Sequence, residues 1–185
     1  MKPTPTVVNR DALEALHASA AGTALALIAA GQELAPMMLL GKVTGNPSEK
    51  QTAQIMGVLP PEFVNAMQRN GRTKEAFIPL VRAILVDGPV DAVIHITEAW
   101  VSTLAKDEPE PDAAIARMAR DGVKNEPGRG EAMIVTLHTL DGSFMSISPI
   151  TTDAAGKRHC VLGAFAPPGL EMSGRLSLNP EPPGP

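Results

Sequence analysis

Apolar residues recur at helical spacing near the start of the chain, from Leu13 to Leu27. Asn9 or Asp11 can cap the beginning of this helix, and Gly31 suits the position just beyond its end. Its apolar face is rich in alanine, which favours close packing against a sheet or a partner. We expect a core helix rather than a dedicated oligomerisation helix.

A second apolar stripe predicts a helix between Thr73 and Val86. The stripe consists of Phe77, Leu80, Val81, Ile84 and Leu85. Thr73 is a possible N-cap, but Pro79 then lies too deep for the first turn, so we expect the helix to start nearer Ile78 or to bend there. The sequence Asp87-Gly88-Pro89 ends it.

Shorter apolar runs predict strands. They begin at Pro36 and extend over Gln51 to Leu59, Glu131 to Leu140, Ser143 to Ile150 and Arg158 to Phe165. The first two form a hairpin. Asp141-Gly142 is the strongest turn signal, and a two-residue turn there places His138 and Met145 on one face and Leu137 and Ser146 on the other.

The segment Val90 to Val101 (VDAVIHITEAWV) predicts a central strand that holds Glu98, Trp100 and His95. One face, which includes Glu98 and Trp100, is nearly all apolar and is expected to meet the helices. The other face, with His95, is mixed and is expected to be half-exposed. The whole pattern indicates an α+β domain with a mostly antiparallel sheet of five to six strands, a hairpin plus a C-terminal meander, packed with two main helices.

The 185 residues are enough for one domain, which we place at residues 11–165. Residues 1–10 read as an extended arm and residues 166–185 as a proline- and glycine-rich tail. Residues 104–130 interrupt the strands, with a short helix expected from Asp112 to Arg120. We expect a solvated excursion there rather than a functional loop.

Three pieces of the chain resemble a family of small uncharacterised bacterial and phage-associated proteins. They are PMMLL from Pro36, TEAW at Thr97 to Trp100 and EAMIVTLHT at Glu131 to Thr139, within a resemblance that spans Asp11 to Phe165. The most recognisable element is Glu98-Ala99-Trp100 at the end of a hydrophobic strand. The resemblance implies a fold and a cytosolic protein, and it transfers no catalytic residue.

Composition disfavours several classes of function. A net charge of −4 without a basic block, and only 3% aromatic residues, disfavour a nucleic-acid-binding protein. The longest uncharged apolar stretch, Ala18 to Gly31, is shorter than the roughly 20 residues of a membrane helix. Asp11 and Glu14 before it disfavour a signal peptide. The expected location is the cytoplasm, or a virion if a phage encodes the chain.

The chemical candidates are weak. Cys160, the single cysteine, would need a histidine base, and the neighbouring His159 points to the opposite face of a strand. A buried structural cysteine is favoured over a nucleophile. The four histidines, His17, His95, His138 and His159, have no metal-binding spacing. We therefore expect no catalytic residue, no metal and no cofactor.

The candidate ligand or interaction residues are Glu98, Trp100 and His95. Glu98 either lines a ligand pocket beside Trp100 or pairs with an Arg or Lys, or accepts backbone N–H bonds, while Trp100 fills the core. We favour the second alternative.

We expect a non-enzymatic assembly protein whose extended termini contact other protein chains in a homo-oligomer or larger assembly, such as a phage or prophage component. The alternative is a small-molecule or regulatory binding domain with a pocket near Glu98 and Trp100.

Overall fold

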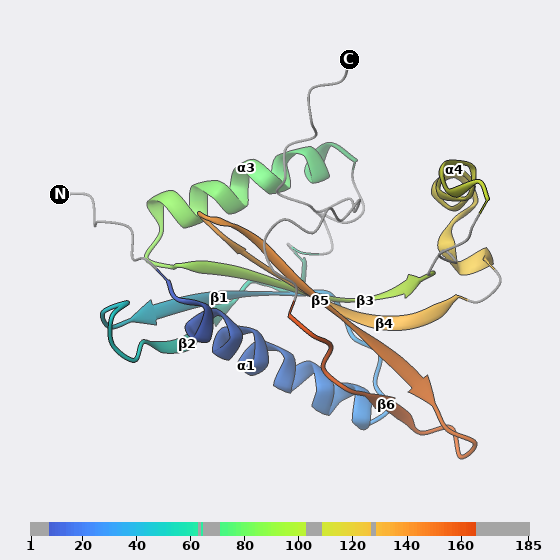
Figure 1. The fold of residues 1–185 in the computed structure, drawn as a ribbon, viewed down its shortest axis with the longest axis horizontal. Coiled ribbons are helices and arrows are strands. Elements are labelled where there is room, and N and C mark those ends of the chain that lie inside the picture. The colour runs from blue at the N-terminus through green and yellow to red at the C-terminus, as the bar shows by residue number, and fades with distance from the viewer. Residues whose placement is uncertain (1–7, 63, 65–70, 103–108, 127–128, 166–185) are drawn as a thin grey trace.

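The computed structural model describes residues 8–62, 64, 71–102, 109–126 and 129–165. Over these residues, six strands form one antiparallel sheet of order β2-β1-β3-β4-β5-β6 (Figure 1). The elements are α1 (Arg10–Ala29), β1 (Met37–Thr44), β2 (Thr52–Val58), α3 (Gly71–Asp87), β3 (Ala92–Val101), α4 (Pro111–Asp121), the short 3-10 helix η1 (Val123–Asn125), β4 (Gly130–Thr139), β5 (Gly142–Thr152) and β6 (Arg158–Cys160). The α+β fold, the antiparallel sheet, the first hairpin and the C-terminal meander are confirmed.

The expected arm and tail fall largely outside the described residues, which exclude residues 1–7 and 166–185. The excursion between β3 and β4 holds α4, which confirms the helix expected from Asp112 to Arg120, while residues 103–108 of this excursion are also outside. The part of the apolar stripe from Leu80 to Leu85 can be followed on α3. The helix runs through Pro79 and begins at Gly71. It therefore begins earlier than Ile78, the start that Pro79 led us to expect.

A helix covers each face of the sheet, α1 on one side and α3 on the other (Figure 1). Successive side chains of β3 point to opposite faces of the sheet. Ile94 and Ile96 pack into the core beneath α1. Val93 packs on the other face, against Val81 and Leu85 of α3. The sequence predicted only one face of this strand to meet helices. That prediction was wrong, because it gave both helices to the same side.

Local chemistry explains how α1 begins and how closely it packs. The Asn9 side chain accepts a hydrogen bond of 2.9 Å from the Ala12 N–H, which confirms one of the two expected caps. Gly31 follows the helix with φ of +76°, as expected for a residue just past its end. At Gly41 of β1, an added Cβ would lie 3.1 Å from Leu16 Cδ2, so α1 approaches the sheet where the strand carries no side chain.

The length of α1 also corrects one expectation. It begins at Arg10 and has 20 residues, so by length and mean hydropathy of 1.4 it passes the test for a membrane-spanning helix that Ala18 to Gly31 alone fails. However, Leu16, Ala20 and Ala24 of this helix lie in the core against the sheet. The core helix of a globular protein and a signal sequence both satisfy the same test.

The C-terminal meander keeps the expected faces, but its register differs from the expected one. The turn residues are Leu140 and Asp141, one position earlier than expected, and Gly142 begins β5 with φ of +145°. His138 pairs with Ser143, and Leu137 with Phe144. Strict alternation then puts His138 and Met145 on the α3 side, and Leu137 and Ser146 on the α1 side, as predicted.

Candidate functional site

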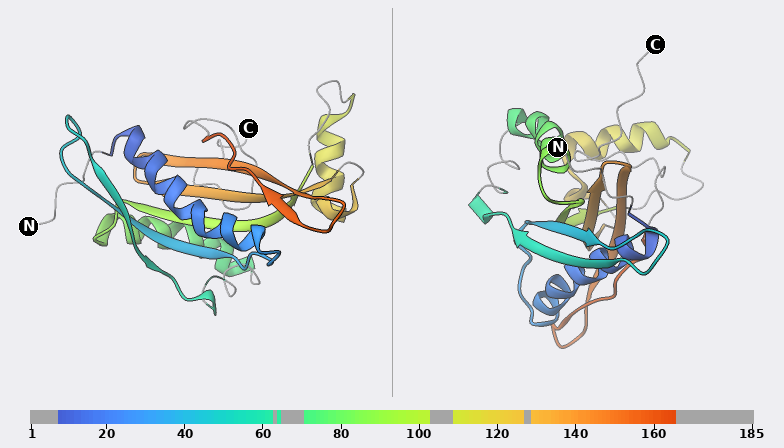
Figure 2. Two further views of the ribbon diagram at one scale, coloured as in Figure 1. Left: turned by 90° about the horizontal axis from the view of Figure 1, so that it is seen from below. Right: turned by 90° about the vertical axis from the view of Figure 1, so that its left-hand side faces the viewer.

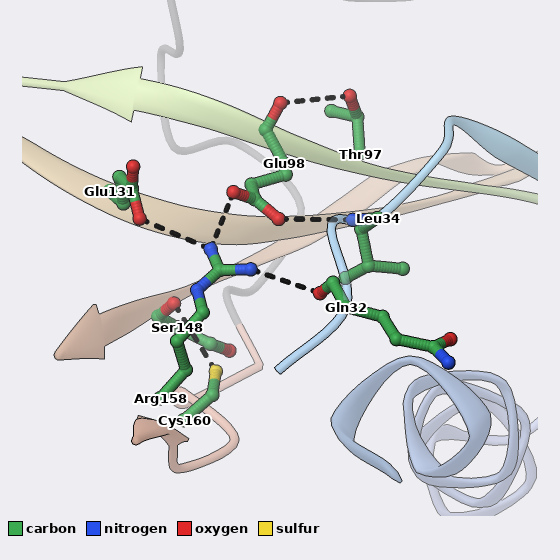
Figure 3. Close-up of polar contacts among 8 residues, drawn as sticks. All are labelled: Gln32, Leu34, Thr97, Glu98, Glu131, Ser148, Arg158 and Cys160. Carbon is green, nitrogen blue, oxygen red and sulfur yellow. Dashed lines mark hydrogen bonds and ion pairs between the residues drawn. The ribbon is translucent and has the colours of Figure 1, made fainter. Parts of the chain in front are cut away.

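Arg158 lies at the centre of a polar cluster on the α1 side of the sheet (Figure 3). Its Nη2 donates to Glu98 Oε1 at 2.5 Å and to Glu131 Oε2 at 3.1 Å, and its Nη1 donates to the Gln32 carbonyl oxygen at 3.0 Å. The second oxygen of Glu98 accepts a hydrogen bond of 3.1 Å from the Leu34 N–H. Both oxygens of the Glu98 carboxylate are therefore engaged within the protein.

The fold brings these groups together from four separate segments. Glu98 and Glu131 lie on β3 and β4, Arg158 begins β6, and the other two partners belong to the loop after α1. The side chains of Arg158 and Glu98 are only 13% and 17% exposed, so their charges need each other to offset the loss of hydration. Hydrogen bonding to Glu98 also raises the pKa of the Arg158 guanidinium.

This cluster contains the contacts that the favoured interpretation of Glu98 expected. Glu98 pairs with a cation and accepts a backbone N–H, whereas the third part of that interpretation, Trp100 in the core, was wrong. Arg158 was missed as the partner because 60 positions separate it from Glu98, and no periodic pattern relates residues at such a distance. The cluster fastens the loop after α1 to the sheet, which is a structural role.

Trp100 does not fill the core. Trp100 lies near the end of β3 and is 44% exposed. The Arg129 guanidinium lies over the indole ring, 5.3 Å from its centroid. The expectation of a core anchor was wrong because β3 extends past the area that the helices cover: burial falls from complete at Ile96 to partial at Glu98.

His95 is buried, with 2% exposure, and the expectation of a half-exposed position was wrong. It lies on the α3 side, where alternation also places His138, whose exposure is 0%. Burial lowers the pKa of both histidines to about 4, and for His138 the neighbouring His95 adds to the effect. Both rings are therefore neutral at pH 7. As predicted, His95 and Glu98 lie on opposite faces of β3.

The remaining chemical candidates occupy separate places. His17 of α1 shares a hydrogen bond of 2.5 Å with the Ser146 hydroxyl, and the exposed His159 pairs with Asp153 at 3.0 Å. The Cys160 thiol lies 3.5 Å from the Ser148 carbonyl oxygen, and burial raises its pKa. A nucleophilic cysteine needs a lowered pKa, because the thiolate is the reactive form. The environment of Cys160 therefore suits a structural thiol.

The outer edge of β2 is the feature that sequence reasoning passed over. β2 is the first strand of the sheet, and in the described part of the chain only β1 pairs with it. Its seven residues, TAQIMGV, contain no charge and no proline, and they alternate between exposed and half-buried positions. Met56 and Val58 are 56% and 60% exposed. Such an edge presents backbone N–H and C=O groups to any strand that can pair with it.

The opposite edge is different. β6 has only three residues, and it begins with the charged Arg158 after the polar turn that Asp153 and Lys157 close. Short length and charge are the usual protections of an edge strand against unwanted pairing. β2 carries neither protection, although a β-bulge between Ile55 and Gly57 leaves Met56 without a partner on β1. The two edges of this sheet are therefore not equivalent.

No protein-family model, curated protein or solved structure matches this chain. The family resemblance inferred from Glu98-Ala99-Trp100 stays a prediction. Any functional argument rests on the geometry described above.

Proposed function

We propose that this chain is a protein-interaction module that takes up a further β-strand along the outer edge of β2. The observation that carries the proposal is the combination of an uncharged strand, Thr52–Val58, with exposed apolar side chains at Met56 and Val58. Backbone hydrogen bonds along such an edge supply affinity, and alternate side chains supply specificity.

The dimensions of β2 suit this role. A strand of seven residues offers an edge of roughly 24 Å. Sheets that avoid unwanted pairing often end in much shorter strands. The edge is also firmly held from behind: β1 lies beside β2, and Ala53 and Ile55 pack onto the core beneath α1. A preorganised edge loses little conformational freedom when a partner strand binds.

The polar cluster supports the proposal indirectly. The alternative function, a ligand-binding domain near Glu98 and Trp100, requires a carboxylate that is available to a ligand. Arg158 and the Leu34 N–H occupy both oxygens of Glu98. The sequence led us to expect that the extended termini contact other chains, but most of their residues lie outside the described part. We therefore propose β2 as the contact surface instead. The assembly would form in the cytoplasm or in a virion.

Site-specific photo-cross-linking in the producing cell tests the proposal. A photoreactive residue replaces Gln54, an exposed position of β2, and the matched control places it at Ala113, an exposed position of α4. We expect a protein adduct from position 54 and none from position 113. The adduct should disappear when Val58→Lys adds a charge to the same edge.

An adduct at position 54 that survives Val58→Lys, or equal adducts at both positions, would contradict strand addition at β2. So would the complete absence of a protein adduct. The identity of the adduct does not affect this test, because a second copy and a different protein both satisfy it.

A further inference from the structure

We infer that the strand taken up by β2 is β2 of a second copy of this chain, so that two sheets join edge to edge in a symmetric dimer. This inference rests on the proposed function and names its partner. Figure 2 shows β2 along the margin of the sheet, and the sheet order leaves this margin without a strand pairing from the described residues.

Antiparallel pairing of two identical strands is self-complementary about a two-fold axis. An axis close to Met56 sets this residue against its own copy and sets Gln54 against Val58 of the second chain. The bulge makes Met56 available for this contact, because it has no partner on β1 and is 56% exposed. The pairing would thus cover the two most exposed apolar side chains of the strand together.

The composition of β2 is compatible with pairing to its own copy. Thr52–Val58 carries no charge, so symmetric pairing places no like charges opposite each other within the strand. The chain leaves the strand direction after Val58: Leu59 and Pro60 follow, and residues 61 and 62 are helical, so the pairing ends with the strand itself.

The assembly closes at two copies. Within the described residues, each chain has one edge of this kind, and the short, charged β6 protects the other. A contact made by a single strand is smaller than the interfaces of permanent dimers, so we expect a dissociation constant in the micromolar range. A mixture of monomer and dimer is then measurable by sedimentation.

The test is analytical ultracentrifugation of the full chain over the micromolar range, with two variants. Met56→Lys places two like charges at the axis and should abolish the dimer. Val86→Lys adds the same charge at a similarly exposed position of α3 and should leave the dimer unchanged.

A cysteine experiment locates the axis. In a Cys160→Ser background, Met56→Cys should form a disulfide-linked dimer with a mild oxidant such as copper phenanthroline. Gln54→Cys, which faces position 58 of the second chain, should do so far more slowly. Thermal melts of all variants check that the fold is retained.

A wild-type monomer at every concentration would overturn the inference. A dimer insensitive to Met56→Lys would overturn it as well. In each case the cross-linking at position 54 decides separately whether β2 binds a different protein, so failure of the dimer and failure of the proposed function remain distinguishable.

Discussion

The Arg158 guanidinium and the Glu98 carboxylate lie 2.5 Å apart, joining the last strand of the sheet to a central one across 60 positions of the chain. Neither side chain is more than 17% exposed. The same guanidinium binds Glu131 and the Gln32 carbonyl oxygen, so one residue holds β3, β4, β6 and the loop after α1 in place.

Removing this cation should be costly. Arg158→Met leaves two carboxylates, Glu98 and Glu131, close together without a counter-charge, and we expect a loss of about 2 to 3 kcal/mol in the free energy of unfolding. Chemical denaturation measures it. Arg120→Met is the matched control, since its pair with Asp121 is exposed and solvent screening should leave it almost no contribution to the free energy of unfolding. Equal losses in both variants would contradict the structural role of Arg158.

Glu98→Gln separates the structural role from a ligand-binding role. Glutamine can still accept the Leu34 N–H, but it loses the charge that faces Arg158, so we expect a loss of about 1 kcal/mol. The size of this loss should not depend on added metabolites. A thermal shift produced by a metabolite in the wild type and absent from Glu98→Gln would instead favour a pocket at this position.

Acid should destabilise the fold through His95 and His138. Their pKa values are about 4 in the folded chain, below the ordinary value of 6.5, so between these values the unfolded chain binds protons that the folded chain excludes. The stabilisation is complete above pH 6.5 and is lost as the pH falls toward 4, with roughly 3 kcal/mol for each histidine. His17 shifts in the same direction.

Denaturation midpoints measured from pH 7 to pH 4 check this sign. His95→Asn removes one of the protonation sites, so the variant should show a shallower loss of stability with falling pH, whatever its stability at pH 7. A slope unchanged by the substitution would mean that folding does not lower the pKa of His95.

The position of Trp100 can be measured directly, because the chain has a single tryptophan. An exposed indole beside Arg129 should emit at the long wavelengths typical of solvent contact and should be quenched readily by iodide, which the guanidinium attracts. Arg129→Gln should reduce quenching by iodide but leave quenching by neutral acrylamide unchanged. Blue-shifted emission resistant to both quenchers would restore the core anchor that the sequence predicted.

The cap of α1 should make a separate contribution to stability. Asn9→Ala removes the acceptor for the Ala12 N–H and should cost about 1 kcal/mol in the free energy of unfolding. Asn9→Ser keeps an acceptor and should cost much less. Equal losses in the two variants would indicate that the side-chain hydrogen bond is not what stabilises this helix end.

Local patterns predicted much of the fold. The helix after Asn9, the strand from Met37 and the hairpin at Asp141 depend on periodicity, caps and turn residues, which neighbouring positions in the chain determine. The exposure of Trp100 and the burial of His95 depend on which strands a helix covers. That is decided by packing between distant segments, and a single sequence does not encode it locally.

The same limit applies to the candidate sites. Glu98 was recognised as an ionisable residue in an apolar strand, and its structural role was favoured correctly. Arg158 was not recognised, because only the order of strands brings it to β3. β2 was predicted as a strand, but its value as a binding edge follows from its position at the end of the sheet, which is again a property of topology.

The most direct test of the central claim is amide hydrogen exchange of the full chain, compared at low and high protein concentration. If β2 pairs with β2 of a second copy, exchange over Thr52–Val58 should slow as the concentration rises, exchange over β6 should not change, and Met56→Lys should remove the difference. Exchange in β2 that does not depend on concentration, or equal slowing at both edges of the sheet, would contradict the account.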